Sequence, residues 1–243
     1  MSNNDLKKLE PGIVWSVFEE ITKIPRPSKK EEKIRNWIKK WAKENKIEVK
    51  KEDKTGNLLL FKPATRGCEN YPTLIIQAHM DMVCQKEENY SIDFENDPLI
   101  VIVDGDNVRA NKTSLGADNG IGIAFGLTAL VDKDLKHGPL EILLTVDEET
   151  GLTGAFAIKT GFFSGKYLLN VDSESIGKIT ISSAGGGGTD FIIPSQYEKN
   201  DSIESYRLHI SGLQGGHSGV NQYLPPPTAR YQPARAVEVA SPS

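Results

Sequence analysis

Residues 73–81 read TLIIQAHMD, and the apolar run 73–78 that opens this stretch decides the fold class. Similar short apolar runs occur at 57–61, 141–146 and 166–171. Before the last two of these runs lies the segment 120–131, which is apolar on nearly all sides and long enough to be a buried helix. Strands that alternate with helices, each strand almost wholly apolar, are typical of an α/β fold with a largely parallel sheet covered on both faces.

Two helices are predicted before the first of these strands. Apolar residues recur at helical spacing within 14–24, and the prolines of residues 24–28, IPRPS, then end the pattern because proline cannot continue a helix. Ser28 followed three residues later by Glu31 resembles a capping box. The segment 34–41 has Ile and Trp at spacings of three and four, which predicts an amphipathic surface helix.

The chain has 243 residues, enough for one large domain or two modest ones. We predict a catalytic domain over 1–183, because the character of the sequence changes after that point. The glycine run at 184–188 predicts a hinge, and 184–223 the start of a smaller α+β lid domain. Residues 224–243 lack periodicity and are expected to be disordered or foreign to the fold. A phosphate-binding loop is the weakest alternative for the glycine run, which is neither GxGxxG nor a P-loop.

Charge and cysteine content exclude several classes of protein. The net charge of −4 provides no basic field, so no nucleic-acid partner is expected. No apolar run approaches the roughly 18 residues needed to span a bilayer, so no membrane partner is expected either. Cys68 and Cys84 have no metal-finger spacing, and the polar start MSNNDLKKLE is not a secretory signal. These features predict a cytoplasmic protein with reduced thiols.

Five clusters of acidic or histidine residues carry the chemistry. Most follow an apolar strand run or precede the buried helix; they are HMD at 79–81, GADNG at 116–120, DEETG at 147–151, NVDSE at 170–174 and GGHSG at 215–219. Residues two apart in a strand point to the same side, so Asp81 could accept a hydrogen bond from one ring nitrogen of His79 while the other binds a metal. The alternative is a core histidine beside a capping aspartate.

Each remaining cluster also has an ordinary structural interpretation. Asp118 could cap the buried helix or bridge two cations. The acids at 147–149 would repel one another at a buried strand end unless something compensates them. Asp172 could cap a turn, and His217 could belong to a simple glycine-rich turn. The histidines at 137 and 209 lack such a context and are expected to be structural.

Together the clusters predict a dinuclear metal site. Unrelated strands would rarely place His, Asp and Glu side chains at their ends by chance. Oxygen ligands mixed with imidazole suit Zn²⁺, with Mn²⁺ or Co²⁺ as alternatives. Two metals held about 3.5–4 Å apart can polarise a carbonyl and activate a shared water. One glutamate of the pair Glu148 and Glu149 fits the general base that such a site needs.

The motifs HMDMV, GADNGIG, DEETG, NVDSE and GGHSG resemble, in order and spacing, those of the M20 metallopeptidases, and within that family those of the bacterial aminoacyl-histidine (cytosolic non-specific) dipeptidases. The resemblance covers roughly residues 5–221 and implies a three-layer zinc-peptidase-like catalytic domain. It also implies that His79 and Asp172 bind one zinc, that Asp118 bridges to a second, and that Glu149 binds this second zinc.

The same resemblance implies the catalytic roles. Glu148 would be the general base, Asp81 would orient His79, and His217 of the lid would contact the substrate. The implied activity is hydrolysis of dipeptides, Xaa-His among them, with a homodimer formed through the lid as a further expectation. An aminoacylase or carboxypeptidase on the same scaffold is an enzymatic alternative.

The sequence also departs from the family. Family members are longer and supply a last histidine ligand after the lid, whereas no histidine follows His217 here. The sequence therefore predicts a C-terminally truncated member with a weakened second metal site. A non-catalytic fragment is the alternative from a different class of function.

Overall fold

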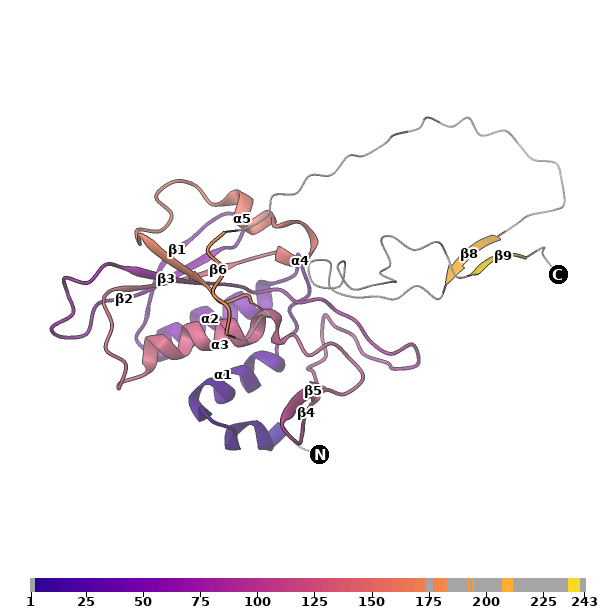
Figure 1. The fold of residues 1–243 in the computed structure, drawn as a ribbon, viewed down its shortest axis with the longest axis horizontal. Helices are drawn as coiled ribbons and strands as arrows, with labels where there is room; N and C mark the ends of the chain where they lie inside the picture. Colours follow the sequence, from indigo (N-terminus) through magenta and orange to yellow (C-terminus); the bar gives the residue numbers. More distant parts are fainter. Residues whose placement is uncertain are drawn as a thin grey trace. The chain divides into compact units, whose positions relative to one another are not determined.

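The computed structural model describes residues 3–173, 177–182, 192, 194, 207–211 and 236–240. The chain divides into two compact units, Met1–Ile179 and Thr180–Ser243. The first contains the sheet and helices that position the predicted site (Figure 1).

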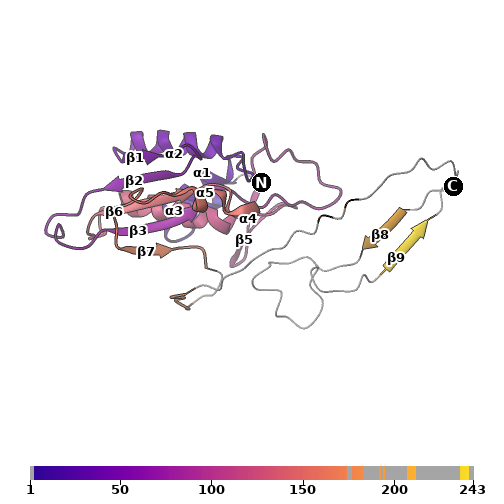
Figure 2. The ribbon, with the colours of Figure 1, turned by 90° about the horizontal axis from the view of Figure 1, so that it is seen from above.

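The first unit is built on a five-stranded mixed sheet. Its order is β1 (Glu48–Glu52), β2 (Leu58–Lys62), β6 (Leu140–Thr145), β3 (Leu74–His79) and β7 (Tyr167–Asn170), which Figure 2 shows as successive strands. β3 pairs in parallel with both β6 and β7, and β2 pairs antiparallel with both β1 and β6. All the strands of this sheet except β2 therefore run in one direction, and the predicted, largely parallel α/β sheet is confirmed.

Three helices cover one face of this sheet (Figure 1). They are α1 (Gly12–Thr22), α2 (Glu32–Glu44) and α3 (Ala117–Val131), preceded by a short 3-10 helix, Asn3–Lys8. The helices bury apolar side chains against alternate strand residues, because residues two apart in a strand face the same side. The centre of this core is formed by Phe18, Ile38, Leu60, Ile76, Ile123, Leu127, Ile142 and Leu144.

The opposite face is covered only in part. Leu59, Ile75 and Leu143 are buried there beneath a loop that contributes Ile158, Phe162 and Phe163. Two short helices follow β6 on the chain, α4 (Glu148–Gly151) and α5 (Thr153–Ala157). The predicted cover on both faces is thus present over the central strands on the helical face and only partial on this one.

Strand β7 is more exposed than its apolar sequence predicts. It is the last strand of the sheet, paired with β3 on one side, and all four of its residues are exposed. The side chains of Tyr167, Leu168 and Leu169 are 61%, 50% and 44% exposed. The described part of the chain therefore presents an apolar strand at one edge of its sheet.

Some elements differ from the prediction. β1 was not predicted, nor was the antiparallel pair β4 (Val101–Asp104) and β5 (Asn107–Ala110). The predicted capping box is wrong: Glu31 is the residue before α2 and makes no cap hydrogen bond, and Ser28 donates its hydroxyl to Asp81 instead. The reason is tertiary, since both side chains bind partners far away in sequence.

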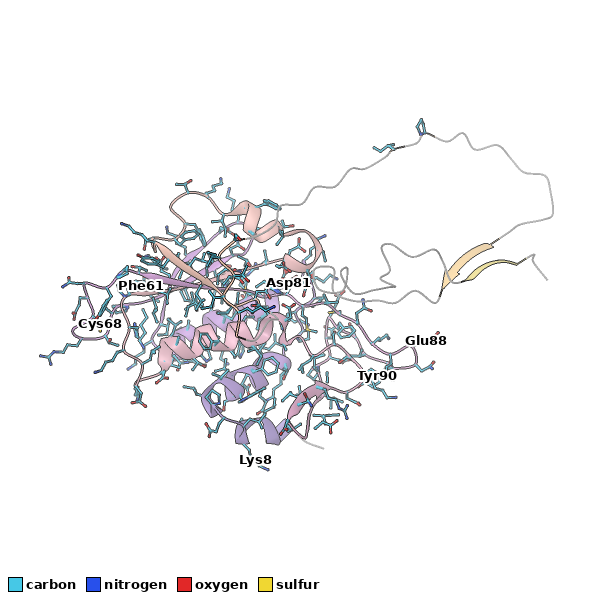
Figure 3. The ribbon with its side chains drawn as sticks, in the orientation of Figure 1. Lys8, Phe61, Cys68, Asp81, Glu88 and Tyr90 are labelled. Atoms are coloured by element: carbon cyan, nitrogen blue, oxygen red, sulfur yellow. The ribbon has the colours of Figure 1, made fainter. Side chains whose placement is uncertain are left out.

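The connection from β2 to β3 lies at the end of the sheet opposite the carboxyl end of β3. It contains the partly exposed Cys68 in a turn closed by hydrogen bonds from Cys68 to Thr65 and from Tyr71 to Cys68. Figure 3 labels Cys68 and Asp81 at the two ends. A side chain at Gly67 would meet no atom within 4 Å, so this turn is open to solvent.

The described backbone of the second unit includes one pair of strands. β8 (Arg207–Ser211) pairs antiparallel with β9 (Ala236–Ala240). β8 falls where a strand was predicted, whereas β9 lies within the segment predicted to lack regular structure. The glycine run at 184–188 lies outside the described residues, and the domain boundaries stay a prediction. Among the described helices, none combines the length and apolar character that a membrane crossing requires.

Candidate metal centre

Four of the five predicted clusters meet at the carboxyl end of the parallel strands. His79 ends β3, Asp147 and Glu148 follow β6, and Asp172 follows β7, so these residues lie at the same end of the sheet. Asp118 joins them from the first turn of α3, where Asp118 and Asn119 have non-helical backbone angles. His217, the predicted substrate contact, lies outside the described residues.

His79 is the centre of this cluster. Its side chain is 1% exposed, and its Nδ1 lies 3.2 Å from Asp81 Oδ1. Its Nε2 lies 2.8 Å from Asp118 Oδ1 and 3.7 Å from Asp172 Oδ2. The two ring nitrogens therefore have separate surroundings: Nδ1 lies against Asp81, and Nε2 faces other carboxylates of the cluster.

Asp81 connects three segments of the chain. Its carboxylate accepts hydrogen bonds from the Ser28 hydroxyl at 2.7 Å and from the backbone amides of Glu148 and Glu149 at 3.0 and 3.2 Å. Burial would raise the pKa of Asp81, but the bonds from His79, Glu148 and Ser28 outweigh it and hold the pKa well below its usual range. Asp81 is therefore a buried anion that fixes the acidic turn beside His79.

The pKa of His79 reflects its acidic neighbours. Burial lowers this pKa, but hydrogen bonds to Asp118 and Asp81 outweigh burial and raise it to about 10. Without a metal the imidazole is therefore protonated at neutral pH, with the Nδ1 proton facing Asp81 and the Nε2 proton facing Asp118. A metal at Nε2 would have to displace that proton.

The carboxylates of Glu149 and Asp172 are repelled by the other acidic side chains of the cluster. Burial and the charge of Asp118 raise the pKa of Glu149 to about 7 and that of Asp172 to about 6. Such shifts mean that the anionic forms are under-compensated by the protein alone. A bound cation would supply the missing positive charge.

Two groups of potential ligand atoms share His79. In the first, His79, Asp118 and Asp172 place ligand atoms within 4.8 Å of one another; in the second, His79 does so with Glu148 and Glu149. The first group matches the predicted ligands of one zinc. Glu149 was predicted to share the second zinc with Asp118, and the structure instead groups Glu149 with Glu148 and His79. The assignment of each ligand stays a prediction.

The acid run at 147–149 is divided by its backbone. Asp147 has a left-handed φ of 51°, is 2% exposed, and accepts hydrogen bonds from the hydroxyls of Thr150 and Thr153. Its amide donates to Glu31 Oε1 at 2.9 Å. The sequence did not separate the three acids, but here Asp147 anchors the turn while the next two residues reach the site.

Ser28 and Glu31 also belong to this site, although the sequence did not predict them as parts of it. Both follow the proline break after α1, and both were interpreted as helix-capping residues. The parallel bridge between Pro27 and Met82 brings this segment to the end of β3. That pairing is a tertiary contact, so local sequence could not reveal it.

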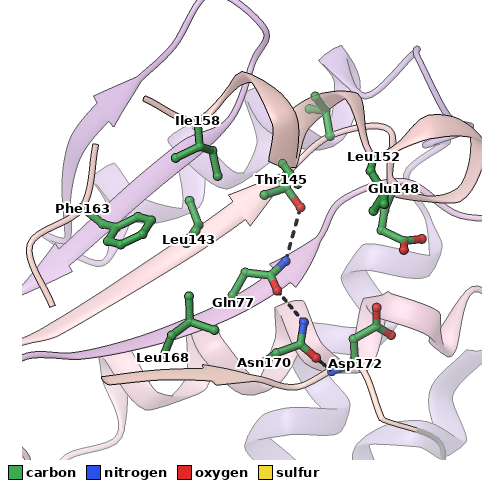
Figure 4. A pocket seen from close by; sticks show the side chains of 12 residues that line it. Gln77, Leu143, Thr145, Glu148, Leu152, Ile158, Phe163, Leu168, Asn170 and Asp172 are labelled. Atoms are coloured by element: carbon green, nitrogen blue, oxygen red, sulfur yellow. Dashed lines mark hydrogen bonds between the residues drawn. The ribbon is translucent and has the colours of Figure 1, made fainter. Parts of the chain in front are cut away.

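A cavity of about 400 Å³ opens beside the cluster. Figure 4 shows Glu148 and Asp172 at one end and Leu143 and Phe163 at the other. Along its floor, the Gln77 amide donates to Thr145 at 3.3 Å and accepts a hydrogen bond from Asn170. The cavity therefore joins an acidic end to an apolar end.

Comparisons with known proteins agree with this arrangement. No family model matches the chain. The chain is 42% identical over 219 residues to the cytosol non-specific dipeptidase of Escherichia coli K12, which covers 89% of this chain and 44% of the relative. It is 26% identical over 178 residues to the uncharacterized protein YqjE of Bacillus subtilis.

Solved structures show the same relationship. The crystal structure of aminoacylhistidine dipeptidase from Vibrio alginolyticus matches with a TM-score of 0.68 and 48% identity, over 70% of this chain and 34% of that one. Aminopeptidase PepT from Bacillus cereus matches with a TM-score of 0.56 and 26% identity, over 67% of this chain and 43% of that one. The chain thus spans less than half the length of these relatives.

Over the region that aligns with these relatives, the chain is similar in sequence and fold to bacterial dipeptidases.

Proposed function

We propose that this chain acts as a metal-dependent dipeptidase that uses two Zn²⁺ ions. One observation carries the proposal: the buried imidazole of His79 faces Asp118, Asp172 and Glu148 within 4.0 Å of its Nε2 atom. The remaining site carboxylate, Glu149, lies in the second ligand group.

The donor set fits zinc. One imidazole nitrogen with several carboxylate oxygens suits Zn²⁺, and Mn²⁺ or Co²⁺ accept the same ligands. We assign His79 and Asp172 to one ion, Asp118 to a bridging position and Glu149 to the second ion. When bound, such a pair supplies polarisation of the peptide carbonyl and a lowered pKa for water.

Side chains of the protein accept the proton of the water and orient the histidine ligand. Glu148 is the general base and accepts the proton of the attacking water, for which its position 4.0 Å from His79 Nε2 is suitable. Asp81 holds Nδ1 of His79 so that Nε2 keeps its direction toward the other carboxylates.

The substrate class follows from the relatives. The Escherichia coli protein is named a non-specific dipeptidase and the Vibrio protein an aminoacylhistidine dipeptidase. We therefore propose unblocked dipeptides, Xaa-His among them, as substrates, and the cytoplasm as the compartment. Contact of His217 with the substrate and dimerisation through 184–223 stay predictions, the latter open to analytical ultracentrifugation.

The test combines elemental analysis with hydrolysis of an Xaa-His dipeptide on one purified sample. We expect at least one zinc ion per chain, approaching two only at saturating zinc because the second site is predicted to be weak, and hydrolysis that Glu148→Gln abolishes while zinc stays bound. Glu88→Gln is the matched control, since Glu88 is exposed and far from Asp81 in Figure 3. Zinc without hydrolysis would support the non-catalytic alternative, and no zinc with no hydrolysis would overturn the proposal.

A further inference from the structure

Arg26 is a charged side chain buried beside the candidate metal centre. It lies in the proline break between α1 and α2, is 2% exposed, and is among the largest fully buried side chains. Arginine is almost never buried without partners, because removing its charge from water is costly. Its partners therefore identify what it does.

The guanidinium group joins two segments that carry site residues. One terminal nitrogen donates to the carbonyl oxygens of Met80 and Asp81 at 3.1 and 2.7 Å, and the other donates to the carbonyl oxygen of Gly116. The first two carbonyls belong to the end of β3 that presents His79. The third opens the turn that presents Asp118. The planar fork of an arginine can serve both sides at once.

Two glycines leave room for this contact. A Cβ atom at Gly116 would lie 2.6 Å from an Arg26 nitrogen, and one at Gly120 would lie 2.8 Å from the same nitrogen. Gly116 also has a left-handed φ of 66°, which favours glycine. Glycine at these two positions, on either side of Asp118, therefore leaves space for the guanidinium between the turn and β3.

The backbone of Arg26 reinforces the same contact. Its carbonyl oxygen accepts the amide of Met82 at 3.1 Å, and Ser28, two residues on, binds the carboxylate of Asp81. The hydrogen bonds of the guanidinium end on carbonyl oxygens, while the carboxylates of Asp81 and Asp118 face His79. Arg26 thus adds positive charge beside the site and leaves these carboxylates directed at the histidine.

We propose that Arg26 is a positioning residue that holds the end of β3 and the Asp118 turn at the spacing at which His79 and Asp118 reach one cation. This inference rests on the proposed function for its link to zinc. Its structural part, the joining of the two segments, is independent of any metal.

The experiment compares wild type with Arg26→Lys and Arg26→Met by two readouts. Hydrogen exchange of the metal-free chain reports on peptides that cover 80–82 and 116–122. Zinc affinity is measured by competition with a chromophoric chelator, and the Co²⁺-loaded chain gives a visible spectrum sensitive to coordination. We expect faster exchange in both peptides, zinc affinity lowered about 10- to 100-fold, and an altered Co²⁺ spectrum in both variants.

Glu141→Gln is the matched control. Glu141 forms a buried ion pair with Lys50 on β1 and hydrogen bonds with Ser164, so its loss destabilises the first unit without touching the contacts of Arg26. The control should lower the melting temperature while zinc affinity and the Co²⁺ spectrum stay at wild-type values. A purely structural Arg26 would behave like this control.

The outcomes separate the two proposals. Normal zinc affinity and normal exchange in Arg26→Lys would overturn the positioning role, because lysine keeps the charge but not the planar fork. If wild type binds no zinc, the proposed function fails, and the exchange data still decide whether Arg26 joins the two segments. Faster exchange limited to these peptides would then support the joining, and unchanged exchange would overturn it.

Discussion

The backbone amide of Glu148 donates a 3.0 Å hydrogen bond to Oδ1 of Asp81, the same oxygen that lies 3.2 Å from Nδ1 of His79. One carboxylate oxygen therefore fixes both the proposed general base and the proposed metal ligand. Their relative position depends on a residue that need not touch metal or substrate.

Asp81→Asn should weaken both the site and the fold. The asparagine NH2 group would face either the amide of Glu148 and Nδ1 of His79, or the amide of Glu149 and the Ser28 hydroxyl, leaving at least one buried backbone donor unsatisfied. We expect a destabilisation of about 1–3 kcal/mol and zinc binding weakened about 10- to 100-fold. Urea unfolding and chelator competition measure the two effects.

Asp104→Asn is the control for this change. Asp104 is 62% exposed and pairs with Arg109 on the surface, so the same chemical substitution should change stability by less than about 1 kcal/mol. An Asp81→Asn chain that binds zinc as well as this control would contradict the central role of Asp81.

Glu141 should make stability depend on acid pH. Burial would raise its pKa, but the ion pair with Lys50 at 2.7 Å and bonds from Ser164 and Gly165 outweigh burial and lower the pKa to about 2. Since the folded-state pKa is below the unfolded one, this stabilisation is full above about pH 4.5 and is lost as pH falls toward 2.

Glu141→Gln should therefore destabilise the chain on the order of 3 kcal/mol at pH 7, and the difference from wild type should shrink as pH falls below about 4.5. Urea unfolding at several pH values measures it. Glu87→Gln, which alters the exposed pair with Lys112 at 3.5 Å, should show little change at any pH. A pH-independent loss for Glu141→Gln would show that the charge of Glu141 is not what stabilises.

Asn57 should be essential for the turn after β6. Its side chain is fully buried, accepts the amide of Val146 at 3.1 Å, and donates to Gly154 and Asp53 at 2.9 and 2.7 Å. Asn57→Ala removes these three hydrogen bonds and leaves the buried amide of Val146 without its acceptor, so we expect a loss of about 2–4 kcal/mol in unfolding free energy. Asn45→Ala, which removes an exposed bond to Trp41, should cost far less.

The exposed strand β7 should promote self-association. Leu168 is 50% exposed on this edge strand, and apolar edges bind other chains. Leu168→Lys should reduce light scattering and binding of a hydrophobic dye, with stability changed by about 1 kcal/mol or less. Ile100→Lys, at 45% exposure outside the sheet, should leave both readouts at wild-type values.

The sequence predicted the strands that build the site to within about one residue at each end, because their apolar runs are short and bounded. It missed β1, whose residues EVKKE are mostly charged and lie at the other edge of the sheet. A strand that pairs on one side and stays half in solvent needs little apolar character. Its existence follows from pairing with β2, which local sequence does not encode.

The side chains that form the site could be predicted from the sequence, whereas the residues that hold them in place could not. His79, Asp118, Asp172 and the glutamate pair were found because acidic and histidine side chains at the ends of apolar runs are unusual. Arg26 was not, because arginine between prolines resembles an ordinary exposed loop residue until the fold buries it.

The turn that contains Cys68 lies at the opposite end of the sheet from Asp81 (Figure 3). Cys84, in contrast, follows Asp81 by three residues and lies within the site region. A chain with Cys84→Ser would thus keep one thiol for a fluorescent label, and a dye there could report unfolding without contacting the chemistry. Natural variation should follow the same division, with insertions and sequence drift tolerated around Cys68 and excluded at the other end of the strands.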